Sequence, residues 1–347
     1  MAVYKFEDIA FNSTEKKKPV EEDKYTYLGL EHLDPDSIYV TRYGADIAPK
    51  GEKLLMKKGD VLFGKRRAYQ KKVAIAPFDG IFSAHGMVLR PKEDVIDKDF
   101  FPLFIKSDYF LDEAIKISVG SLSPTINWRD LKELNFSLPS LEEQKKLAQV
   151  LWSIYRTKEE YKRLIKSTDD LVKSQFIEMF GTEDNPSSGV EFERLGDLAS
   201  YVNGFAFKPA DWGTKGLPII RIQNLTGSGV EFNYYDGEYP EQVEVNDGDV
   251  LISWSASLGV YLWNKGTAIL NQHIFKVVFD KKTIDKYFFM YAVQQKLDEM
   301  GDKSHGSTMK HIVKKAFDNI KIPYPEDRRQ VSFSELVKQS DKSKFYG

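Results

Sequence analysis

An internal duplication restricts the fold of this chain more than any other feature. The letters "GDVL" begin at Gly59 and again at Gly248. Longer matches follow in the same order and at nearly constant separation, namely "IDKDFF" from Ile96 with "IDKYFF" from Ile284, and "LNFSLPSLEEQ" from Leu134 with "IKIPYPEDRRQ" from Ile320. A four-letter match alone is weak evidence. The collinear series predicts two domain-sized copies, because its period far exceeds that of solenoid repeats.

Both copies have the same coarse pattern, which mixes helix and strand. Apolar runs such as "GDVLFG" and "GDVLISW" are typical of strands. They are followed by a helical stretch, a Gly-Ser loop and a segment that closes on proline. We therefore expect an α+β protein with two duplicated mixed α/β domains, at residues 1–139 and 182–325.

The segment between the copies, residues 140–181, predicts one long helix. Ser140 and Glu143 form a capping box at its start, and Gly181 suits its end. About forty residues would extend over roughly 60 Å. Apolar residues recur at heptad spacing, which is typical of a coiled coil: Leu147, Leu151, Ile154, Tyr161, Ile165, Val172 and Met179. The alternative is an ordinary helix packed on its own domain. A second helix, expected at residues 326–347, reaches about half that length.

Charge and composition exclude several classes of site. The 347 residues carry a formal net charge of −2, so a nucleic-acid surface would have to be a local basic patch. The chain has no cysteine, which excludes disulfides and thiolate zinc sites. Its N-terminus lacks a signal-peptide core, and no apolar run approaches the roughly 20 residues of a membrane span. These features predict a soluble, cytoplasmic protein.

Catalytic motifs are missing from the sequence. It has no glycine-rich phosphate loop and no HExxH pattern. His85 and His273 occupy equivalent places in the two copies, and the simplest interpretation is that each packs or hydrogen-bonds locally. We expect no catalytic residue, no bound metal and no cofactor in this chain.

The letters after each "GDVL" differ, which suggests a shared framework that carries different recognition loops. The first copy continues "FGKRRAYQKK" and the second "ISWSASLGVY". Basic side chains neutralise phosphates, and Arg, Asn and Gln pair with base edges. Two weakly binding domains at a fixed spacing would reinforce each other. The alternatives are a solvated surface and ordinary turn residues. The candidate DNA-facing residues are Lys65, Arg66, Arg67, Tyr69, Lys71, Lys72, Arg221, Gln223, Asn224, Asn271, Gln272, His273 and Lys310.

Taken together, these motifs resemble the specificity (S) subunits of type I restriction-modification systems. The resemblance covers nearly the whole chain. It rests on "GDVL" in each copy, "GSLSPTINWRDLKELNFSLPSLEEQ" from Gly120, "FIEMFG" from Phe176 and "GSTMKHIVKKAFDNIKIPYPEDRRQ" from Gly306. The chain departs from the family pattern at Leu122, at Arg329, which replaces a glutamate, and in its short final helix.

The resemblance implies a non-catalytic subunit that recognises DNA. Each copy would be a target recognition domain that reads one half of a split double-stranded DNA sequence. The long helices would pair as an antiparallel coiled coil. Two modification subunits, which bind S-adenosylmethionine and methylate adenine, would dock on this scaffold, and restriction subunits would be further partners. The short final helix leaves part of the seam for another chain to cover, or reflects a truncated form.

Two other hypotheses remain open at this point. The duplicated domains could grip two copies of one protein partner and not contact DNA. Less favoured is an enzyme with a site shared between the copies and centred on His85 or His273.

Overall fold

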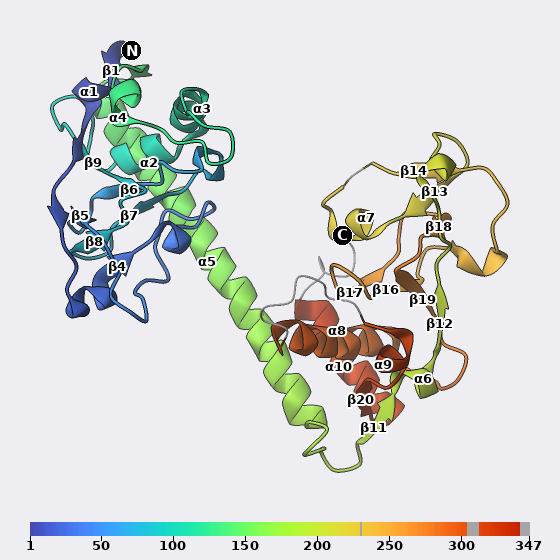
Figure 1. Ribbon diagram of the computed structural model, residues 1–347. Coiled ribbons are helices and arrows are strands. Elements are labelled where there is room, and N and C mark those ends of the chain that lie inside the picture. Colours follow the sequence, from blue (N-terminus) through green and yellow to red (C-terminus); the bar gives the residue numbers. More distant parts are fainter. Residues whose placement is uncertain (230, 304–311, 341–347) are drawn as a thin grey trace. The chain divides into compact units, whose positions relative to one another are not determined.

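A computed structural model describes residues 1–229, 231–303 and 312–340 of the chain (Figure 1). The chain divides into two compact units, residues 1–161 (unit 1) and 162–347 (unit 2). Helix α5, Leu141–Phe180, runs through the division as one uninterrupted helix. Within the described ranges, no helix is long and apolar enough to cross a membrane.

Unit 1 contains two four-stranded sheets and a short strand pair. The first sheet has the order β2-β9-β6-β7 and is antiparallel throughout. The second has the order β3-β5-β8-β4, with β4 and β8 parallel. The bounds of these strands are β2 Ala10–Ser13, β3 Lys16–Lys17, β4 Tyr27–Leu28, β5 Lys53–Met56, β6 Val61–Phe63, β7 Val73–Ile75, β8 Gly80–Phe82 and β9 Met87–Pro91. Strand β1 Ala2–Lys5 pairs with β10 Asn135–Leu138, and the α-helices before α5 are α1 Phe6–Ile9, α2 Phe101–Lys106, α3 Asp108–Lys116 and α4 Trp128–Leu131.

Unit 2 repeats this plan. One sheet has the order β12-β19-β16-β17, and the other has the order β14-β13-β18-β15, with β13 and β18 parallel. The strands are β11 Glu191–Arg194, β12 Ser200–Asn203, β13 Leu217–Ile220, β14 Asn233–Tyr235, β15 Glu244–Val245, β16 Val250–Ser253, β17 Gly259–Leu262, β18 Ala268–Leu270, β19 Ile274–Val278 and β20 Lys321–Tyr324. The helices are α6 Leu195–Leu198, α7 Ile222–Thr226, α8 Lys286–Lys303, α9 Lys314–Asp318 and α10 Asp327–Ser340.

The second sheets differ at one edge. Three strands are common to both, β5-β8-β4 in unit 1 and β15-β18-β13 in unit 2. The fourth strand adds beside β5 in unit 1, as β3, but beside β13 in unit 2, as β14. The two copies therefore share a core and differ in what surrounds it. The expected fold class, duplicated mixed α/β domains joined by a long helix, is confirmed.

The repeated "GDVL" is a turn followed by a buried strand. Gly59 and Gly248 have φ of 93° and 90°, a backbone region that favours glycine. The next residue closes the turn: Asp60 Oδ2 accepts from Lys57 N at 2.8 Å, and Asp249 Oδ2 accepts from Asn246 N at 2.9 Å. All residues of β6 and β16 are buried. These constraints explain why the same four letters recur, and they do not extend to the loop that follows.

Helix α5 begins and ends where the sequence predicts. The backbone N and the hydroxyl of Ser140 both donate to Glu143 Oε2, at 2.9 and 2.8 Å. These bonds form the predicted capping box at the start of the helix. Gly181, with φ of 75°, follows the last turn. The seam residues lie in different environments. Val172 is buried and Met179 is half-buried in the core of unit 2, whereas Leu147, Ile154, Tyr161 and Ile165 are exposed.

Helix α10 packs against the end of α5 through Phe333. Phe333 is fully buried, and its ring centroid lies 5.2 Å from that of Phe176 and 5.5 Å from that of Phe180. Arg329, the residue that departs from the family pattern, donates to the carbonyl oxygens of Met179 and Ser188. These hydrogen bonds of Arg329 join the start of α10 to the last turn of α5 and to the loop after it.

Candidate nucleic-acid interface

The predicted DNA-facing residues of unit 1 lie on the loop between β6 and β7. The loop is held to the segment around Thr125, since Ile126 N donates to Lys65 O at 2.9 Å and Ala68 N donates to Pro124 O at 3.2 Å. Arg67 and Lys71 have φ of 54° and 49°. Positive φ at such residues costs free energy and is concentrated at functional sites. The loop is thus fixed in a shape that the chain would not adopt locally.

The six predicted residues on this loop divide into two groups. Arg66, Arg67 and Tyr69 are exposed, and Lys65 is half-buried. Lys71 Nζ contacts Asp108 at 2.6 Å and Asp112 at 2.8 Å, and hydrogen bonds to these carboxylates raise its pKa.

Lys72 Nζ donates to Leu30 O at 2.7 Å. The ammonium groups of Lys71 and Lys72 are thus engaged by unit 1 itself, and we leave both out of the interface. Lys65, Arg66, Arg67 and Tyr69 remain.

His85 lies beside this loop and contacts Arg66. Its Nε2 is 3.5 Å from Arg66 Nη1, and its carbonyl oxygen accepts from Arg66 N at 3.3 Å. Burial lowers the pKa of His85, and the charges of Arg66, Lys65 and Lys53 lower it further. Three cations, Arg66, Lys65 and Lys53, thus lie close enough to this loop to act on His85, and such a cluster suits an anionic partner.

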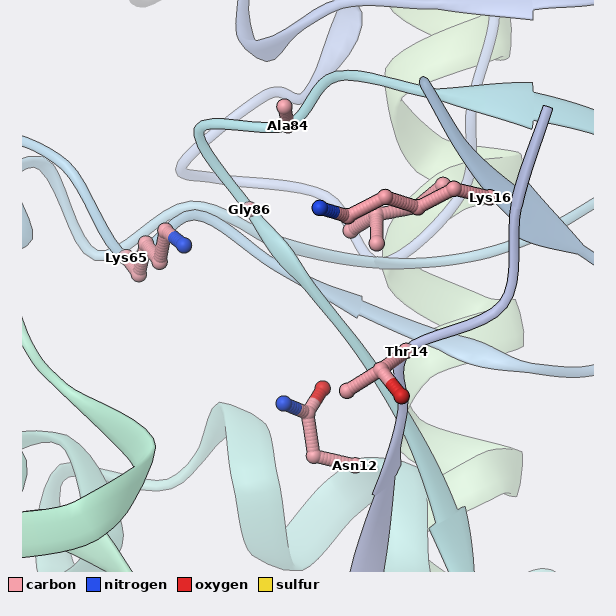
Figure 2. Close-up of a pocket in the computed structure, with 7 residues that line it drawn as sticks. Asn12, Thr14, Lys16, Lys65, Ala84 and Gly86 are labelled. Carbon is pink, nitrogen blue, oxygen red and sulfur yellow. The ribbon is translucent and has the colours of Figure 1, made fainter. Parts of the chain in front are cut away.

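A pocket beside Lys65 adds residues that sequence reasoning missed. It has a volume of about 500 Å³ and is lined by Asn12, Thr14, Lys16, Leu54, Lys65, Ala84 and Gly86 (Figure 2). Asn12 lies on β2, Lys16 on β3 and Lys65 after β6, so the pocket forms only when both sheets assemble. The polar run "NSTEKKK" from Asn12 was the available signal, but nothing in it indicates a pocket.

In unit 2 the predicted residues gather at the carboxyl ends of two parallel strands. Ile219 and Ile220 of β13 pair with Ile269 and Leu270 of β18, so Arg221 and Asn271 follow neighbouring strands. Asn271 N donates to Ile220 O at 3.1 Å. The Arg221 guanidinium lies 5.2 Å from the Trp212 ring centroid, and its Nε is buried without a hydrogen-bond partner. These two predicted residues are thus brought together although they lie far apart in the sequence.

The other predicted residues of unit 2 differ in how exposed they are and in whether their polar groups are already hydrogen-bonded. Gln223 is exposed, and Gln272 is half-buried. His273 has φ of 74° and a buried Nδ1 without a partner. Asn224 is only 6% exposed, and its amide is used by the backbone: Oδ1 accepts from Arg221 N, and Nδ2 donates to Gly229 O and Glu231 O. Asn224 therefore shapes its loop and is left out of the interface. Lys310 lies outside the described residues.

The described residues contain no group of three or more His, Asp or Glu side chains that could hold a metal ion. His85 and His273 lie in different units, and each contacts its own surroundings.

A family model for the type I restriction modification DNA specificity domain matches this chain twice, at residues 2–167 and 187–345. The chain belongs to this family. Each unit is thus one copy of the specificity domain, and the first match extends into α5.

Named relatives agree with this assignment, and a solved structure shares the fold. The EcoBI specificity subunit of Escherichia coli is 27% identical over 156 residues, which is 43% of this chain but only 33% of that subunit. The MjaX specificity subunit of Methanocaldococcus jannaschii is 25% identical over 374 residues, 96% of this chain and 84% of the relative. The type I S subunit from M. genitalium shares the fold, with a TM-score of 0.54 at 17% identity over 98% of this chain and 89% of the other.

The two specificity domains share a framework and differ in the loop that follows it. The Asp-closed turn and its buried strand are common to both domains. The loop after that strand is basic in the first specificity domain, and in the second the same strand leads to Trp254. The two domains are therefore built alike and present different chemistry.

Proposed function

We propose that this chain is the DNA-recognition subunit of a type I restriction-modification complex and that its two specificity domains read different DNA sequences. The observation that carries the proposal is the divergence directly after the shared turn. Lys65, Arg66 and Arg67 follow it in the first domain, and Ser253 and Trp254 in the second. Cations bind phosphates and arginine also reads guanine. In the second domain Trp254 stacks on Phe275 at the equivalent position, so that domain must read DNA with other side chains.

Two domains with different DNA-binding surfaces on one chain recognise a target that has two separate parts. Each domain would bind one half of a split double-stranded sequence, and the covalent link raises the effective concentration of the second domain once the first is bound. Arg221 and Asn271 are the side chains of the second domain best suited to base edges, because arginine pairs with guanine and asparagine with adenine.

The chain acts without catalysing a reaction. Methylation of adenine would be carried out by partner modification subunits, two per complex, which bind S-adenosylmethionine. Restriction subunits would be further partners. The relatives support this division of labour, since they carry the name of specificity subunits. A complex that acts on DNA in this way works in the cytoplasm.

The experiment is to express the full chain with the modification subunit encoded beside it and to map methylated adenines by direct sequencing. A split, asymmetric motif would support two different readers on one chain. A split palindrome would show instead that two chains each contribute one domain. A folded complex that methylates no adenine and does not bind duplex DNA would contradict the proposal and favour a scaffold that binds only protein.

A further inference from the structure

The pocket of unit 1 brings two lysines to face each other. Figure 2 shows the amino groups of Lys16 and Lys65 pointing into the same space from opposite sides, with Asn12 and Thr14 along one edge. Leu54, Ala84 and Gly86 complete the lining, so no acidic side chain lines the pocket. The space is thus cationic and offers hydrogen-bonding groups.

The charges in this pocket are poorly compensated. Lys65 makes no ion pair within the described ranges, and burial together with the charge of Lys16 lowers its pKa. Lys16 has one carboxylate nearby, Glu52 at 3.8 Å, and both of these side chains are at least half exposed. Exposed pairs of this kind contribute little. An anion between the two ammonium groups would relieve their repulsion.

A polar atom in the same pocket also lacks a partner. Asn12 Oδ1 is buried without a hydrogen bond. Buried amide groups are almost always hydrogen-bonded, so each exception needs a reason. A half turn of this amide would place its NH2 group where the oxygen now lies, and that group can donate to an anion.

The second specificity domain shows that the fold does not require this hollow. Leu62 pairs with Val88, which pairs with Ser13. In the same register, Leu251 pairs with Lys276, which pairs with Val202. Asn12 precedes Ser13 by one residue, as Tyr201 precedes Val202. Lys65 follows Leu62 by three residues, as Trp254 follows Leu251. Tyr201 and Trp254 therefore occupy the positions of Asn12 and Lys65.

Aromatic rings pack together at these positions in unit 2. Trp254 stacks on Phe275, with ring centroids 5.5 Å apart, and Tyr201 lies 6.1 Å from the same ring. Tyr201 is buried and donates its hydroxyl to Leu195 O at 3.0 Å. The same framework is thus stable with the position filled by apolar groups. The polar hollow of unit 1 needs a reason other than folding.

We propose that this pocket seats a phosphate group of the DNA backbone. Lys16 and Lys65 bind its oxygens from two sides, and the Thr14 hydroxyl and the Asn12 amide donate to it. The inference rests on the proposed function and adds to it: the phosphate fixes the position of the DNA strand beside Arg66 and Arg67 and carries no sequence information itself. Free inorganic phosphate shares this chemistry, so the test must separate the two sources.

The test compares two double variants of the full chain that lose the same charge. K16Q/K65Q removes both ammonium groups from the pocket. K116Q/K146Q is the matched control, because Lys116 and Lys146 are exposed and pair with Glu113 and Glu142 on their own helices. Affinity for a mixed-sequence duplex is measured by fluorescence anisotropy over a range of salt concentrations. Circular dichroism and thermal melting establish that both variants are folded.

We expect K16Q/K65Q to bind the duplex roughly five- to tenfold more weakly at 0.1 M salt. The slope of log affinity against log salt should fall by about 0.9, the value of one phosphate contact. The control should stay within about twofold of the wild type. In K16R/K65R, which keeps the charge, most of the affinity should return.

Each other outcome is decisive. Equal weakening in both double variants would mean a general charge effect and overturn the phosphate seat. An unchanged K16Q/K65Q beside a weakened R66Q/R67Q would overturn the seat and leave the proposed function intact. If inorganic phosphate raises the melting temperature of the wild type but not of K16Q/K65Q, while both bind DNA equally, the pocket binds free anions instead. A wild type that does not bind duplex DNA, either alone or in complex with its modification subunits, would refute the proposed function itself.

Discussion

Gln144 Oε1 accepts a hydrogen bond from the backbone N–H of Asp97 at 2.8 Å, and the second copy repeats the contact, with Gln330 Oε1 and Asp285 N also 2.8 Å apart. Both glutamines are buried, and each also donates to the carbonyl of a proline before its helix, Pro139 or Pro325. The shared glutamine therefore fastens the start of α5 and of α10 to the loop before α2 or α8. This hydrogen bond, rather than helix propensity, explains why both copies of the motif have glutamine at this position.

Replacing Gln330 with leucine should destabilise unit 2. The substitution leaves Asp285 N and Pro325 O buried without partners, which costs about 1–3 kcal/mol for each lost group. Differential scanning calorimetry should show a lower transition temperature. Gln149→Leu, at an exposed position on α5, is the control and should have little effect. An unaltered transition in Gln330→Leu would mean that water replaces the glutamine.

Phe333→Ala should detach α10 from the end of α5. The ring is fully buried between Phe176 and Phe180, and loss of such a side chain costs about 3–5 kcal/mol. We expect protease cleavage near residue 330 to become faster in limited proteolysis. Val331→Ala, on the exposed side of the same helix, should leave the cleavage rate unchanged. Equal rates in both variants would show that other contacts hold α10.

R66Q/R67Q should weaken DNA binding for every sequence. Both side chains are exposed on a fixed loop, and each removed phosphate contact lowers the slope of log affinity against log salt by about 0.9. A titration over 50 to 200 mM salt measures this slope. If affinity and slope equal those of the wild type, the loop does not face DNA.

Binding of DNA should become tighter as the pH falls from about 7 to about 5.5, through His85. In the folded protein without DNA, the pKa of His85 is below its ordinary value of about 6.5. The stability that neutral His85 contributes is therefore complete above about pH 6.5 and is lost as the pH falls through the pKa of the folded state. Bound phosphates offset the cations that lower the pKa, so DNA raises it and binding takes up a proton. Anisotropy at a series of pH values tests this. In His85→Gln the pH dependence should disappear, and its persistence would assign the proton elsewhere.

Arg221→Lys should change one half of the methylated motif and leave the other half as it is. The guanidinium lies over the Trp212 ring, and lysine has neither the planar surface for stacking nor the fork that pairs with guanine. Methylated adenines mapped in the co-expressed complex would show relaxed specificity in one half-site. A change in both half-sites would argue against one reader per domain.

The sequence alone determined the order of parts and the limits of the main helix. The duplication is visible in the sequence itself. The Asp-closed turn, the Ser140 cap and the turn at Gly181 depend on interactions between residues a few positions apart. Local rules therefore sufficed for these features. Those rules also placed Arg66 and Arg67 on a loop after a buried strand, where the structure has them exposed.

Only the tertiary structure decided which side chains remain available to a partner. Lys71 lies next to Lys72 in a basic run, yet α3 supplies Asp108 and Asp112 to neutralise it. Asn224 turns inward to hold its own loop. The phosphate pocket needs Asn12 and Lys16 beside Lys65, about fifty residues away along the chain. Such contacts depend on how strands pair across a sheet, and the duplicated sequence allows the same positions to be filled with aromatic rings in one copy and left hollow in the other.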